Sequence, residues 1–194
     1  MAFDYSKGNL VCTCRVWRPV KRLPQDGGFT LVELLIVVAV IGIIAAIGVS
    51  QIMRARVAAN ETAAIGSVRS INTGQTSYSA AAGQGGFATS LTILGAPCLG
   101  GTYGFVSPDL NPAAPGVTPG AATGVIKSGY DVDVVGNGAV GPTDCNGLPT
   151  NSDYVVTAVP RTLGTTGQRG FNSAGAGTIF FDAAGGAAGT IPIQ

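Results

Sequence analysis

The longest apolar run of the chain opens with GGFTLVELLIVVAV (residues 27–40) and continues to Val49. From Leu31 to Val49 the only charged side chain is that of Glu33. As an α-helix, residues 29–49 would extend roughly 30 Å, which is about the thickness of the hydrocarbon core of a bilayer. The sequence therefore predicts a transmembrane helix over residues 29–49.

Two other kinds of segment resemble this run less well. A core helix of a soluble protein seldom reaches this length without a polar face. The apolar part of a cleaved secretory signal is normally about 7–15 residues long and ends at small residues. This run is longer, and it continues into Gln51–Arg56 without a clean break.

Basic residues flank the apolar run unevenly. Those before it are Lys7, Arg15, Arg18, Lys21 and Arg22, and those after it, up to residue 70, are Arg54, Arg56 and Arg69. Because basic residues gather on the cytoplasmic side, this balance favours a cytoplasmic N-terminus and an outer C-terminal part.

Glu33 needs an explanation, because an ionised carboxylate within a bilayer costs about 2.5–3.5 kcal/mol on insertion scales. No Lys or Arg lies within two helical turns inside the apolar run to pair with it. We therefore expect its partner to come from another chain or from a new positive group. Cleavage after Gly28 would create such a group, the free amine of Phe29, one helical turn from Glu33.

These features together resemble the processing site of the type IV pilin and pseudopilin superfamily: a basic leader, Gly28, Phe29, Glu33 and a long apolar helix. The resemblance implies that a membrane-embedded prepilin peptidase cuts between Gly28 and Phe29 and N-methylates Phe29. It also implies that Glu33 pairs with the N-terminal amine of a neighbouring subunit during assembly. The resemblance is strong over residues 21–50 and looser beyond them.

The chain departs from the family pattern in two respects. The leader of residues 1–28 is longer than many in the family. Many type IV pilins also have a proline where this chain has Ser50, so that Gly42 and Gly48 are the local helix-weakening residues.

The resemblance implies a structural subunit of a type IV pilus-like filament, or fimbrium, and not an enzyme. Its partners would be itself, other pilin subunits, prepilin peptidase and the pilus or secretion assembly machinery, with no nucleic acid required. It would lie in the bacterial inner membrane before assembly and in the periplasm or a cell-surface pilus afterwards. The alternatives are a major-type pseudopilin of a type II secretion system and a membrane-anchored binding module.

A helical pattern continues beyond the membrane. Its apolar positions recur at spacings of 7, 4, 3 and 7 and are Val57, Ala64, Val68, Ile71 and Tyr78. Glu61 and the neighbouring arginines fall mostly on other faces. We expect one helix over residues 29–80, amphipathic in its lower half, between a leader (1–28) and a C-terminal globular head (81–194).

The sequence of the head is typical of short strands separated by turns. Residues 129–135 alternate between apolar and acidic side chains, and residues 154–159 and 178–181 are rich in β-branched and aromatic side chains. Residues 102–106 are a weaker strand candidate, and residues 89–97 are expected to be a loop with one short helical turn. The sequence predicts an antiparallel meander packed on the helix stripe, an α+β fold.

The four cysteines form two pairs, one on each side of the apolar run. Cys12 and Cys14 lie in the leader, and with no further Cys or His nearby they do not complete a tetrahedral metal site. Cys98 and Cys145 lie in the head, where an oxidising location favours a disulfide over two free thiols. We expect such a bond to fix the irregular segment 108–120 to the sheet.

The composition of the chain excludes some classes of catalytic site and disfavours some ligands. The chain has no histidine, which excludes Ser-His-Asp and Cys-His catalysis, and its net charge of +1 does not favour nucleic-acid binding. Residues 136–141 match GxGxxG, but turn sequence follows instead of a helix, so we expect a glycine-rich loop there. We expect no cofactor, with calcium in a C-terminal loop as the alternative through Asp144, Asp153 or Asp182. The sequon at Asn60 is expected to be a coincidence.

Overall fold

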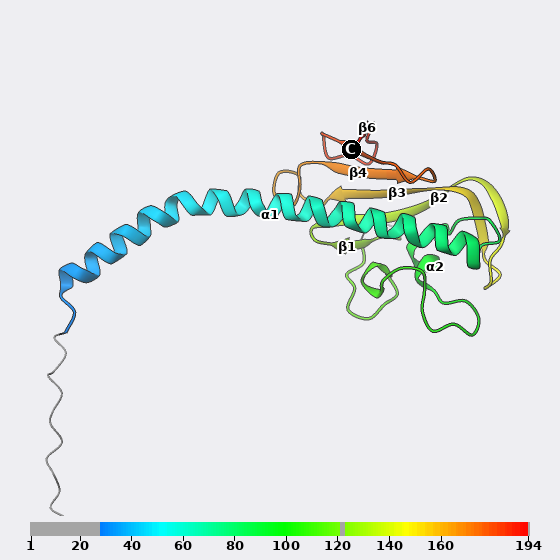
Figure 1. Ribbon diagram of the computed structural model, residues 1–194, viewed down its shortest axis with the longest axis horizontal. Coiled ribbons are helices and arrows are strands. Elements are labelled where there is room, and N and C mark those ends of the chain that lie inside the picture. The colour runs from blue at the N-terminus through cyan, green and yellow to red at the C-terminus, as the bar shows by residue number, and fades with distance from the viewer. Residues whose placement is uncertain (1–27, 121–122, 194) are drawn as a thin grey trace, which may run out of the picture. The chain divides into compact units, whose positions relative to one another are not determined.

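A computed structural model describes residues 28–120 and 123–193 (Figure 1). The predicted leader up to residue 27, including Cys12, Cys14 and the leader cations, lies outside the described residues. The chain divides into two compact units, Met1–Ile43 and Ile44–Gln194, which are described separately.

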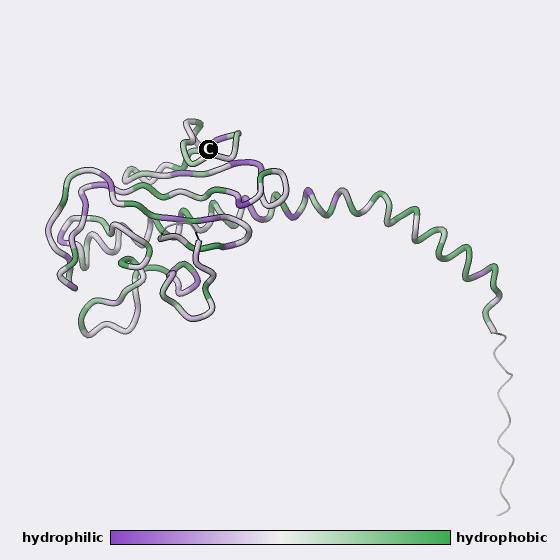
Figure 2. The backbone as a smooth tube through the Cα atoms, turned by 180° about the vertical axis from the view of Figure 1, so that it is seen from behind, coloured by the Kyte–Doolittle hydropathy of each residue, from purple (hydrophilic) through white to green (hydrophobic). Residues whose placement is uncertain are grey.

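In the first unit, the described structure is the start of helix α1 (Leu31–Ala81). The large apolar side chains of α1 from Leu31 to Met53 are all exposed, in the first unit and beyond it. Figure 2 shows this part of the chain as predominantly hydrophobic. Within the described residues, α1 is the one helix long and apolar enough to cross a membrane. Such a surface requires a lipid or protein environment.

The second unit contains a six-stranded sheet whose order follows the chain, β1-β2-β3-β4-β5-β6, with every neighbouring pair antiparallel. The strands are β1 (Val125–Lys127), β2 (Tyr130–Thr143), β3 (Pro149–Pro160), β4 (Gly170–Ala174), β5 (Ile179–Asp182) and β6 (Ile191–Pro192). The predicted antiparallel meander and α+β class are therefore confirmed.

The core of this unit lies between the C-terminal part of α1 and one face of the sheet (Figure 1). The apolar stripe positions that the helical spacing predicted are buried, namely Ala64, Val68, Ile71 and Tyr78, and Val57 is half-buried. They pack in one cluster with sheet residues such as Val132, Val156 and Phe171. Full burial of one such side chain contributes about 1.5–3 kcal/mol, so this seam is what joins helix and sheet.

Two expectations about the loops differ from the structure. Strand β2 continues to Thr143, because residues 136–143 pair with β3 through register shifts after Asn137 and after Val140. Residues 102–106 do not form a strand. There the Phe105 N–H donates to the carbonyl of Leu94 in the short helix α2 (Leu91–Gly95), 2.9 Å away, so this backbone turns toward a helix instead of the sheet.

Other elements match or extend the expectation. Helix α2 is the short helical turn predicted within residues 89–97, and Ser90 caps it. The structure adds strands β1, β4 and β6 and the 3-10 turn η1 (Pro108–Leu110), which the sequence did not predict. These elements are short, so few alternating positions were available to indicate them.

Candidate processing and assembly site

The first turn of α1 is closed by a reciprocal pair of side chains. The backbone N–H and the hydroxyl of Thr30 both donate to Glu33 Oε2, at 3.1 and 2.9 Å. In return the Glu33 N–H donates to Thr30 Oγ1 at 3.1 Å. This is a capping box, in which two side chains satisfy backbone N–H groups that a helix start leaves without partners. A negative side chain here also interacts favourably with the positive end of the helix dipole.

This geometry gives Glu33 a hydrogen-bond partner in its own chain, in addition to the positive partner that we expect from another chain or from a new amine. Thr30 is an intrachain hydrogen-bond partner, and the spacing Thr-x-x-Glu before an apolar run was the sequence signal for it. Thr30 is neutral, however, and none of the three ion pairs among the described residues involves Glu33. The carboxylate is therefore hydrogen-bonded but has no counter-charge in this part of the chain.

The expected cleavage bond lies directly before this capping box. Gly28, Phe29 and Thr30 precede the helix and are exposed, and the Phe29 side chain is 89% exposed. An added Cβ on Gly28 would meet no atom within 4 Å. The bond between Gly28 and Phe29 is thus open to a peptidase, and its cleavage would leave the Thr30–Glu33 hydrogen bonds intact.

Comparison with known families matches this segment. Residues 24–49 match the family described as the prokaryotic N-terminal methylation motif. The chain carries the class III signal peptide of type IV pilins and pseudopilins. The match supports a type IV pilin-like or pseudopilin protein, and it implies processing by prepilin peptidase and assembly into filaments with other pilin subunits. Neither a search of curated proteins nor a search of solved structures returned a match.

The motif and the single apolar helix near the N-terminus indicate a membrane-anchored protein. The methylation motif ends at residue 49, and the exposed apolar surface of α1 ends at Met53. The cleavage at Gly28, the methylation of Phe29 and the pairing of Glu33 with an amine stay predictions.

C-terminal to the exposed apolar part of α1, a second acidic residue, Glu61, joins the helix to the head. Glu61 was expected outside the apolar stripe of the helix, but it is 6% exposed. Its Oε1 accepts the N–H groups of Gln168 and Arg169 at 3.0 and 3.3 Å, and its Oε2 accepts Arg169 Nε and Nη2 at 3.0 and 2.6 Å. Asn60, the sequon residue, donates its amide to the Thr166 carbonyl at 2.9 Å. Both Asn60 and Glu61 of α1 therefore hydrogen-bond to the head.

The environment of Glu61 changes its acidity in two opposing ways. Burial raises the pKa of the carboxyl, while the hydrogen bonds and positive charge of Arg169 and the N–H of Gln168 lower it. The net pKa is lowered, so Glu61 is held ionised in the folded protein. Sequence reasoning missed the pair because its partners lie more than a hundred residues further along the chain.

The end of α1 is joined to the head by a second set of contacts. The Tyr78 hydroxyl donates to Asp144 Oδ2 at 2.8 Å, and burial followed by the nearby Asp144 carboxylate raises the pKa of Tyr78. Cys145 follows, and it forms a disulfide with Cys98, with Cα atoms 5.6 Å apart. The bond whose formation the sequence favoured thus links the loop after α2 to the turn between β2 and β3.

We expected that disulfide to fix segment 108–120 to the sheet, but other contacts do so. This segment is held instead by the ion pair between Asp109 and Lys127, 2.5 Å apart, and by the Ile126 N–H, which donates to the Thr118 carbonyl at 2.9 Å. Both contacts run to β1, the edge strand that the sequence did not predict.

The three aspartates considered for calcium each accept backbone N–H groups of the fold. Asp144 Oδ1 accepts the N–H groups of Asn146 and Leu148, Asp153 Oδ1 accepts that of Gly175, and Asp182 accepts those of two following residues. In residues 28–120 and 123–193, no three His, Cys, Asp or Glu side chains gather as a metal site would require. Calcium binding stays an untested prediction.

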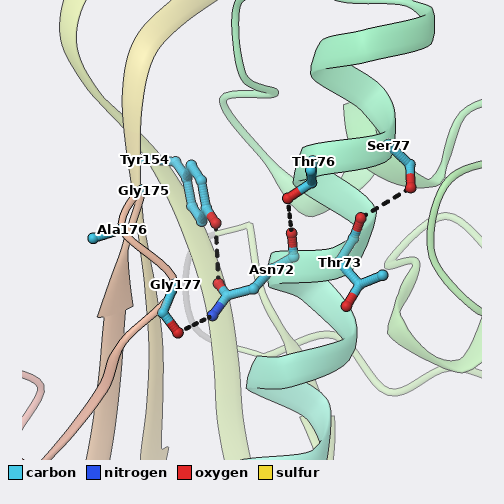
Figure 3. A pocket seen from close by; sticks show the side chains of 8 residues that line it. All are labelled: Asn72, Thr73, Thr76, Ser77, Tyr154, Gly175, Ala176 and Gly177. Atoms are coloured by element: carbon cyan, nitrogen blue, oxygen red, sulfur yellow. Dashed lines mark hydrogen bonds between the residues drawn. The ribbon is translucent and has the colours of Figure 1, made fainter.

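Two remaining features have structural explanations. Residues 136–141, the GxGxxG match, lie within strand β2 and do not lead into a helix, which a dinucleotide site requires. A shallow depression of about 350 Å³ lies between α1 and the turn after β4 (Figure 3). Its central Asn72 donates to the Gly177 carbonyl and accepts from the Tyr154 hydroxyl, so its polar atoms are used within the fold.

Proposed function

We propose that the chain is a structural subunit of a type IV pilus-like filament and not an enzyme. The observation that carries this proposal is the methylation motif placed directly before an exposed apolar helix with Glu33 in its first turn. In this proposal residues 1–28 are a cleaved leader, residues 29–80 are the assembly helix, with 29–49 in the membrane, and residues 81–194 are the head.

The apolar surface of α1 needs a different cover at each stage. In the inner membrane, lipid surrounds the exposed side chains between Leu31 and Met53. In the filament, the same side chains pack against other subunits. Since lipid tails already shield them, the gain on leaving the bilayer is small, and assembly requires the pilus or secretion machinery.

Glu33 acts at the N-terminal end of this helix. Cleavage after Gly28 creates a positive amine on Phe29, and the capping box keeps the Glu33 carboxylate at the same end of the helix. A neighbouring subunit can then present its amine to a carboxylate that has no counter-charge in the described part of its own chain. Such a pair within apolar surroundings would set the register between subunits.

The motif serves both pili and the pseudopili of type II secretion. We favour a pilus, because the head is substantial and carries the Cys98–Cys145 disulfide. We also favour a subunit of the shaft, because Glu33 is present. A plain membrane-anchored binding module is the remaining alternative, and it would not need the cleavage.

Substitutions at Glu33 test this function. Glu33→Leu removes both the charge and the capping hydrogen bonds, whereas Glu33→Gln keeps a side chain that can cap but removes the charge. We expect both variants to insert into the membrane, and both to give far fewer filaments by electron microscopy of sheared surface fractions. Wild-type filament yield from Glu33→Gln would show that only capping matters and would contradict the charge pair.

A further inference from the structure

The cations of the described residues fall into two groups. In the head, each basic side chain has a carboxylate partner: Lys127 pairs with Asp109, Arg161 with Asp131 and Arg169 with Glu61. On α1, Arg54, Arg56 and Arg69 are exposed and take part in none of these ion pairs. The three arginines of α1 thus differ from the basic residues of the head, because none of these ion pairs neutralises their charge.

Arg54 and Arg56 occupy a particular place on the helix. They directly follow Met53, the last of the exposed large apolar side chains of α1. At about 100° per residue they lie about 200° apart around the helix, so they extend from opposite sides of it. No carboxylate lies three or four residues from either arginine. We call these two residues the arginine collar.

The collar lies where lipid phosphates are expected. The proposed membrane segment, residues 29–49, would extend roughly 30 Å as a helix, the thickness of the hydrocarbon core. Arg54 follows Val49 by five residues, about 7.5 Å along a helix, which places Arg54 and Arg56 at head-group level. Guanidinium groups bind phosphate through paired N–H donors.

We propose that the arginine collar binds the phosphates of anionic phospholipids in the leaflet at the Arg54 end of the apolar segment. It thereby fixes how deeply the helix sits before assembly. The proposal rests on membrane insertion of α1 and not on filament formation.

A second copy of the chain is the competing partner for the collar. The side-chain carboxylates in the described residues of the second unit already have partners within that unit. Those in ion pairs are Glu61, Asp109 and Asp131, and those that accept backbone N–H groups are Asp133, Asp144, Asp153 and Asp182. Free phosphate oxygens of lipid are therefore the better match to two unpaired guanidinium groups.

The test uses the unprocessed full chain in phosphatidylcholine vesicles that contain trace spin-labelled phosphatidylglycerol or spin-labelled phosphatidylcholine. The fraction of labelled lipid immobilised by the protein gives its preference for the anionic lipid. We expect Arg54→Gln/Arg56→Gln to reduce this preference by roughly fivefold for each arginine, and we expect salt to weaken it in the wild type. The matched control, Arg69→Gln, changes the third unpaired arginine of α1, which lies further from the apolar segment, and should retain the wild-type preference.

An unchanged preference in the double variant, or an equal loss in Arg69→Gln, would overturn the proposal. Reduced cross-linking between copies, with lipid preference unchanged, would assign the collar to a second copy and overturn it as well. Because unprocessed protein in vesicles forms no filaments, failure here leaves the filament proposal standing. Failure of the Glu33 test likewise leaves the collar untouched.

Discussion

At the scale of single residues, Thr30 and Glu33 decide how the helix begins. Their side chains satisfy each other's backbone N–H groups, and the Thr30 carbonyl accepts the first helical hydrogen bond from Leu34 at 3.3 Å. The spacing Thr-x-x-Glu made this pair readable from the sequence. Its importance for function is that the helix start, and with it the carboxylate, has a fixed geometry before any subunit arrives.

Replacing Thr30 tests this cap. Thr30→Val keeps the shape of the side chain but removes the hydroxyl, so we expect the first turn to lose about 1 kcal/mol of stability. Faster hydrogen exchange at the amides of Glu33 and Leu34, measured by NMR in detergent micelles, would report the loss. Thr30→Ser keeps the hydroxyl and should exchange as the wild type does. Equal exchange in all three proteins would refute the cap.

Glu61 shows what residue-level reasoning from sequence could not reach. Glu61 lies four residues after Val57 and three before Ala64, on the apolar stripe itself, so the expectation that it falls on another face was wrong. Its burial depends on Arg169 and Gln168, which reach it from the loop between β3 and β4. Nothing local to Glu61 encodes that meeting, because it depends on how the whole meander packs.

The Glu61–Arg169 pair predicts a pH dependence of stability. Since folding lowers the pKa of Glu61 below its usual 4.5, the pair stabilises the fold above that value. This contribution is lost as the pH falls through the lowered pKa of the folded state. We expect Glu61→Gln to lower the unfolding free energy at neutral pH, by about 1–3 kcal/mol in urea titrations. The difference from wild type should shrink as the pH falls below 4.5; a difference independent of pH would count against an ionised Glu61.

At the scale of elements, the sequence predicted a helix or strand correctly where its apolar periodicity extended over many residues. The stripe on α1 and the alternation in β2 were both visible, and both lie in the core. Strand β4 was hidden, because its sequence Gly170–Ala174 is short and its pairing is supplied by β3 and β5. The continuation of β2 through residues 136–143 was hidden by glycines that read as a loop.

The disulfide acts at this same scale, since it joins the loop after α2 to the β2–β3 turn. Cys98 and Cys145 are 47 residues apart, and closing such a loop stabilises a fold by about 2–4 kcal/mol. We expect Cys98→Ser/Cys145→Ser to lower the unfolding free energy from urea titrations by a corresponding amount, and with it the urea midpoint. Cys12→Ser/Cys14→Ser serves as the matched control and should unfold as the wild type does. No difference between the two double variants would argue against a stabilising bond.

For the whole molecule, two parts of the chain differ in how they meet water. The second unit buries a core between the C-terminal part of α1 and the sheet. The apolar side chains of Leu31–Met53 are exposed and require lipid or other subunits. This organisation could be predicted from the sequence, because length, apolarity and the motif are all local features. The way in which the head is tied to the helix could not, because those contacts join distant segments.

Maturation of the whole chain in a cell is tested most directly by mass spectrometry of its N-terminus. The protein would be isolated from bacteria with and without an active prepilin peptidase. With the peptidase, the account predicts a mature chain that starts at N-methylated Phe29; without it, the leader remains attached to Gly28. An uncut bond between Gly28 and Phe29 in the presence of the peptidase would contradict the account.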